Sequence, residues 1–102
     1  MILVRHVFQC KWGHSQQVVD GMKQMVGRVH APGSVRILTD LSGPFHTVVQ
    51  EVVVDSLAEW EKGRAELFAN PEFQKMQEEL GSEIPFVSGH VEFYTIEHNY
   101  GD

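Results

Sequence analysis

The chain has 102 residues, of which 42% are hydrophobic and 22% charged, and these proportions are typical of one globular domain. Its formal net charge is −6 and its Lys and Arg residues do not cluster, so we expect neither a nucleic acid nor an anionic membrane surface as a partner. No apolar run approaches the ~20 residues of a membrane-spanning helix. The single cysteine and the lack of a secretory pattern at the N-terminus favour a cytoplasmic protein.

The first third of the chain predicts a strand, a helix and a second strand. Ile2–Cys10 is rich in β-branched and apolar residues and is typical of a strand. After a possible cap at Ser15, apolar residues recur every three or four positions, which indicates an amphipathic helix. This helix is expected to end at Ala31-Pro32-Gly33, and Val35–Thr39 then predicts a short strand.

The remainder predicts a hairpin, a long helical segment and a last strand. Residues 41–44 have the composition of a turn, and residues 45–54 form a strand too apolar to have one face in water. Ser56 begins a helix with capping-box spacing, Asn70-Pro71 interrupts it, and Gly81 ends it. Residues 86–96 contain the last strand.

This order of elements predicts an α+β fold, the ferredoxin-like βαββαβ sandwich with a four-stranded antiparallel sheet. Right-handed crossovers place both helical segments on one face of the sheet, with strand order fourth, first, third, second. The other face would be bare although the strands are apolar on both sides, and a second copy packed sheet against sheet would cover it. We therefore predict a homodimer, built from one domain over residues 1–97 with a polar tail over 98–102.

Several motifs give the sequence a family resemblance. The segment from Gly43 to Gln50 (GPFHTVVQ), followed by DSLAE from Asp55, resembles the signature segment of the NIPSNAP family. The later segment ANPEF, from Ala69 to Phe73, resembles the interruption of that family's second helix. Lys11-Trp12-Gly13 stands where the family usually has Lys-Pro-Gly.

This resemblance implies a dimeric α/β-barrel domain. The same superfamily contains cofactor-free antibiotic-biosynthesis monooxygenases, haem-degrading oxygenases, EthD-like proteins and small isomerases. The sequence also departs from the family pattern, because Gln50 stands where histidine is common and Val52 and Val54 stand where aromatic residues are common. These departures imply a pocket with a different specificity, or with less chemistry.

Candidate site residues follow from the alternation of side chains along strands. On each strand we assign the more apolar set to the helices and the more polar set to the cavity of the dimer. His46 and His90 are the candidate catalytic acid and base, because imidazole titrates near neutrality. The candidate substrate-binding residues are Arg5, Gln9, Arg36, Gln50, Glu92 and Tyr94. A slip of one residue in the register would exchange every assignment on a strand.

Each candidate also has a structural interpretation. His46 and His90 both follow turns and could cap them in solvent, and Arg5, Arg36 and Glu92 could form ion pairs within the cavity. Tyr94 could be a core residue with a satisfied hydroxyl, and Cys10, on an apolar strand face, is interpreted as an inert buried thiol. The histidine spacings match no metal motif, and we expect neither a metal nor a cofactor.

Two hypotheses for function remain open from the sequence. One is a small-molecule enzyme of the cofactor-free oxygenase or isomerase type, which acts on a small apolar or aromatic organic ligand in the cavity of the dimer. The other is a non-catalytic module that binds a small molecule or another protein. An open cavity with convergent polar groups would favour the first hypothesis, and a cavity closed by valine side chains would favour the second.

Overall fold

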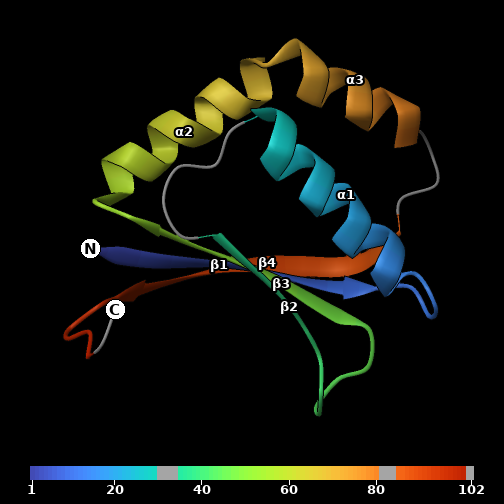
Figure 1. Ribbon diagram of the computed structural model, residues 1–102, viewed down its shortest axis with the longest axis horizontal. Coiled ribbons are helices and arrows are strands. Elements are labelled where there is room, and N and C mark those ends of the chain that lie inside the picture. Colours follow the sequence, from blue (N-terminus) through green and yellow to red (C-terminus); the bar gives the residue numbers. More distant parts are fainter. Residues whose placement is uncertain (30–34, 81–84, 101–102) are drawn as a thin grey trace.

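The computed structural model describes residues 1–29, 35–80 and 85–100, and Figure 1 shows it as a sheet with helices on one side. The elements in chain order are β1 (Ile2–Cys10), α1 (Ser15–Val29), β2 (Val35–Thr39), β3 (Thr47–Val54), α2 (Leu57–Ala69), α3 (Pro71–Leu80) and β4 (Phe86–Thr95). The predicted helix ends at Ala31-Pro32-Gly33 and Gly81 lie outside the described residues.

The sheet has the predicted ferredoxin-like topology. Its strand order is β2-β3-β1-β4 and every neighbouring pair is antiparallel. All three helices of the described residues lie on the same face of this sheet, which leaves the opposite face without helices (Figure 1). We call the latter the helix-free face. The α+β prediction is therefore confirmed.

The core lies between the sheet and α1. Val4 and Val48, from the two central strands, are fully buried. The central cluster consists of Cys10, Val18, Val19, Met22 and Val48, with Phe8, Ile37 and Phe86 packed against it. Apolar burial of this kind stabilises a fold by about 25 cal/mol per Å² removed from water. The spacing of Val18, Val19 and Met22 on one side of α1 is the pattern that predicted this helix.

The interruption between α2 and α3 also follows the sequence prediction. Ser56 caps α2 by accepting a hydrogen bond from the Glu59 N–H at 3.2 Å. Asn70 ends α2 and begins α3, because its side-chain oxygen accepts from the Glu72 N–H at 2.8 Å. Pro71 then fills the first helical position, where its missing N–H costs nothing. None of the helices within residues 1–29, 35–80 and 85–100 combines the length and the apolar character that a membrane span requires.

The third strand begins later than predicted. The sequence indicated residue 45, but β3 begins at Thr47, and Phe45 and His46 belong to the turn. His46 has a φ of 59°, a left-handed conformation that few residues other than glycine adopt and that does not continue a strand. Asp40 closes the loop, since its N–H donates to the Thr47 carbonyl at 3.1 Å and its carboxylate accepts from the Thr47 N–H at 2.9 Å.

Candidate functional site

Most of the predicted polar residues lie on the helix-free face. Trp60 of α2 contacts the rings of His6 on β1 and Phe93 on β4, which shows that these two side chains point toward the helices. The alternate residues of both strands therefore point the other way. The residues placed on the helix-free face as predicted are Arg5, Gln9, Arg36, His90, Glu92 and Tyr94.

The prediction for β3 is wrong by one residue. Gln50 lies opposite His6 and Val48 lies opposite Phe8, so Gln50 faces the helices and not the cavity. His46 is on the helix side as well, where its ring meets Ser15 of α1. The two alternating rows of side chains on β3 differ little in polarity. An assignment based on polarity alone therefore placed the wrong row on the helix-free face. The side chains of Thr47 and Glu51 face the helix-free side instead.

A chain of charges crosses the helix-free face. Glu51, on the central strand β3, is only 6% exposed. Arg36 of β2 donates a hydrogen bond to one of its carboxylate oxygens, and Arg5 Nε of β1 forms an ion pair with the other at 2.9 Å. Arg5 Nη1 then donates to Glu92 Oε1 of β4 at 3.1 Å. One network thus links all four strands and neutralises a buried carboxylate, which would be costly to bury alone.

Glu92 organises the outer end of this network. His90 Nε2 lies 2.8 Å from Glu92 Oε2, and the Tyr94 hydroxyl donates to Glu92 Oε1 at 3.0 Å. The hydrogen bonds from His90 and Tyr94 lower the pKa of the Glu92 carboxyl. An ionised carboxylate only accepts hydrogen bonds, so Nε2 of a neutral His90 carries the proton and Nδ1 is the basic nitrogen. A histidine oriented by a carboxylate in this way is suited to proton transfer.

A groove of about 530 Å³ lies beside the network. Arg5, His90 and Glu92 line it, together with Val7, Val49 and the loop between β2 and β3, which projects on the helix-free side (Figure 1). Gln9 also lines it but is held by the loop, since its amide donates to the Phe45 carbonyl and accepts from the Thr47 hydroxyl. Gln9 therefore fixes the wall of the groove.

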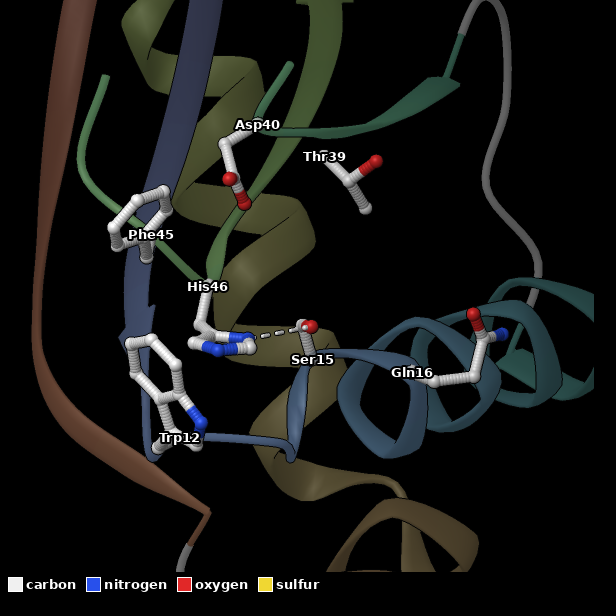
Figure 2. Close-up of a pocket in the computed structure, with 7 residues that line it drawn as sticks. All are labelled: Trp12, Ser15, Gln16, Thr39, Asp40, Phe45 and His46. Atoms are coloured by element: carbon white, nitrogen blue, oxygen red, sulfur yellow. Dashed lines mark hydrogen bonds between the residues drawn. The ribbon is translucent and has the colours of Figure 1, made fainter. Parts of the chain in front are cut away.

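His46 belongs to a second cavity, of about 460 Å³, beside the start of α1 (Figure 2). Its Nδ1 lies 3.3 Å from the Ser15 hydroxyl, and its ring contacts Trp12 with 4.5 Å between centroids. The two candidate catalytic histidines therefore lie in different cavities, on different sides of the sheet. The prediction that both histidines face the cavity of the dimer is therefore wrong for His46, because it depended on the register of β3.

Glu51, the most buried member of the network, was not among the predicted site residues. Glu51 was assigned to the helix side, although a carboxylate within a valine-rich strand was a signal that charged partners had to lie beside it. Its cross-strand partners are Arg5 and Arg36, so knowledge of the register would have identified the set. Within residues 1–29, 35–80 and 85–100, no group of three or more His, Cys, Asp or Glu side chains could hold a metal ion.

Comparison with known proteins identified similar folds. Neither protein-family models nor curated protein sequences gave a match to the chain. An uncharacterized NIPSNAP domain protein from Burkholderia xenovorans matches over 100% of both chains, with a TM-score of 0.82 and 17% identity. A NIPSNAP family protein from Agrobacterium tumefaciens matches over 92% of this chain and 90% of its own, with a TM-score of 0.79 and 16% identity.

Similarity extends to a second group of proteins. A protein from Deinococcus radiodurans, named for a proposed role as an antibiotic biosynthesis monooxygenase, matches over 100% of this chain and 98% of its own. Its TM-score is 0.64 and its identity 13%. At these identities the likeness concerns the fold. The chain therefore has the ferredoxin-like fold of the NIPSNAP proteins, the family that its sequence motifs resemble.

Proposed function

We propose that this protein acts on a small organic molecule in the groove of the helix-free face, which a second copy of the chain covers. The observation that carries the proposal is the His90–Glu92 pair, at 2.8 Å, with Arg5 and Tyr94 bonded to the same carboxylate. These groups converge beside a groove of about 530 Å³, which is in the range of small-molecule sites.

The charges of the network indicate the class of ligand. Arg5 and Arg36 are already paired with Glu51 and Glu92, so the face offers little net charge to a strong anion. Val7 and Val49 provide apolar wall in the same groove. The site is therefore suited to an uncharged molecule with an apolar or aromatic body and a weakly acidic O–H or C–H, such as a phenol or a carbonyl compound.

Proton transfer by His90 is the chemistry that we assign to the site. Nδ1 would accept the acidic proton of the ligand, and Glu92 would stabilise the resulting imidazolium. Return of that proton to another carbon gives an isomerase. Reaction of the electron-rich anion with oxygen gives a cofactor-free oxygenase. A second copy on this face would exclude water from the groove. Exclusion of water strengthens the electrostatic interactions of His90 with the ligand and of Glu92 with the imidazolium.

A ligand screen tests this proposal. We expect a panel of phenols, quinones and small ketones, measured by thermal shift, to include a compound that raises the melting temperature by mass action. The shift should be lost in His90→Ala and retained in His46→Ala, whose ring lies on the other side of the sheet. If His46→Ala removes binding and His90→Ala does not, the site has been placed on the wrong face.

The pairing of two copies has its own test. Light scattering should give twice the chain mass of 11.6 kDa. Val7 lies in the middle of the helix-free face, opposite Val49, so Val7→Lys should yield a monomer because it puts an unpaired charge into the interface. Ala65→Lys, at an exposed position of α2, is the matched control and should remain dimeric. A wild-type monomer at micromolar concentration would contradict the proposal.

A second candidate function is a non-catalytic dimeric module. It is favoured by the internal pairing of the charges, since Glu51 forms ion pairs with both Arg5 and Arg36 within one chain. A network with this degree of pairing can fix the alignment of two sheets without acting on a ligand. The two functions differ in one observable, because only the enzyme shows turnover that depends on His90.

A further inference from the structure

We propose a second binding site in the cavity beside the start of α1, and we propose that its ligand is a small organic ammonium ion. The cavity measures about 460 Å³, and its lining contains neither His90 nor Glu92, although Thr39 and Asp40 line both this cavity and the groove of the helix-free face. Its residues come from the loop before α1, from the start of α1, from the end of β2 and from the β2–β3 connection (Figure 2): Trp12, Ser15, Gln16, Thr39, Asp40, Phe45 and His46.

Three aromatic rings form one wall of this cavity. Trp12 meets Phe45 edge-on, with 5.8 Å between centroids and 84° between planes, and it meets His46 at 4.5 Å and 69°. Both large rings are mostly exposed to solvent, at 76% for Trp12 and 68% for Phe45. Hydrophobic side chains that expose this much area beside a cavity are candidates for ligand contact, and Trp is the ring that best attracts a cation.

The charge of the residues that line the cavity favours a cationic ligand. Apart from His46, Asp40 is the titratable residue of the lining set, so the formal charge beside the rings is negative. Figure 2 shows the Asp40 carboxylate directed into the cavity above the His46 ring. Aromatic rings and a carboxylate that line the same cavity can together attract an ammonium group, because the carboxylate is negative and the face of an aromatic ring presents negative potential.

The wall is held in place before any ligand binds. The Lys11 N–H donates to the Pro85 carbonyl at 2.8 Å and the Cys10 N–H donates to the His46 carbonyl at 2.9 Å, so both ring-bearing loops are tied to the sheet. The Asp40 Oδ1 accepts from the Thr47 N–H at 2.9 Å, which fixes the carboxylate. Such preorganisation reduces the ordering cost of binding.

NMR titration with choline as the probe tests the site. We expect the Trp12 indole N–H signal to shift and the Trp60 indole signal, on α2, to stay, with a Kd in roughly the millimolar range for an exposed cation–π site. The uncharged isostere 3,3-dimethylbutan-1-ol should produce a much smaller shift. Equal responses to both compounds, or a shift of Trp60 in place of Trp12, would overturn the proposal.

Two variants isolate the contribution of the Asp40 charge. Asp40→Asn keeps the oxygen that accepts from Thr47 and removes the charge, so the Kd for choline should rise about threefold to fivefold. Asp55→Asn, which removes an exposed carboxylate elsewhere, should leave the Kd unchanged. Added NaCl should weaken choline binding in the wild type whether or not Asp40→Asn folds. If the Kd for choline changes neither with added NaCl nor in Asp40→Asn, the proposal of an ammonium site is refuted. This test does not depend on His90.

Discussion

Replacing Arg5 by methionine tests whether the charge network holds the sheet together. Arg5 bridges Glu51 and Glu92, and its side chain is 31% exposed, whereas that of Glu51 is 8% exposed. Methionine keeps most of the apolar stem of arginine, so the change removes the charge and little packing. The matched variant is Arg36→Met, which removes the other partner of Glu51 from a side chain that is 67% exposed.

The two variants should differ in cost because the two arginines differ in burial. Removing one partner of a fully buried ion pair costs about 3–5 kcal/mol, and removing an exposed pair costs about 0–1 kcal/mol. Arg5 is between these limits, so we expect Arg5→Met to lower the free energy of unfolding by about 2 kcal/mol. Arg36→Met should lower it by less than about 1 kcal/mol. The first change corresponds to a fall in melting temperature of roughly 8–16 °C for a chain of this size.

Urea unfolding at pH 7 measures both costs. It should be repeated at two protein concentrations, because unfolding of a dimer depends on concentration. The double variant with Glu51→Gln provides the coupling energy between Arg5 and Glu51, which should exceed about 0.5 kcal/mol for groups in contact. If Arg36→Met costs as much as Arg5→Met, or if the coupling is zero, the network does not stabilise the sheet as we have argued.

Three further predictions concern the helix side of the sheet. Burial, with a smaller contribution from the charge of Arg64, lowers the pKa of His6 below its ordinary value of 6.5, so the unfolded chain binds a proton that the folded chain resists. Stability should therefore fall as the pH drops below about 6.5, and His6→Phe should flatten this dependence in pH-dependent urea titrations. Val48 is fully buried, and Val48→Ala should cost about 2–3 kcal/mol by thermal unfolding; a cost below 1 kcal/mol would contradict its place in the core. Burial, and then the charge of Asp40, raises the pKa of the Cys10 thiol, so a disulfide reagent should label Cys10 only when urea unfolds the chain.

Local patterns in the sequence determined the elements and their order. Apolar spacing in α1, the Ser56 cap of α2 and the Asn70-Pro71 break are decided by residues within a few positions of one another, so they can be read without the fold. The strand order followed from the β-α-β units and their handedness, and the structure has the same order. Arg5, His90 and Glu92 were placed on the correct face because β1 and β4 alternate clearly.

Tertiary structure decided the register of β3 and, with it, the site. Where β3 begins depends on the left-handed turn at His46 and on the bonds between Asp40 and Thr47, which involve residues seven positions apart. A shift of one residue moved Gln50 to the helix side and Glu51 into the charge network. Strand alternation has a period of two, so a face can be assigned only when the cross-strand partner is known. For Glu51 those partners are Arg5 and Arg36, one of them 46 residues away in the chain, and folding alone brings them together.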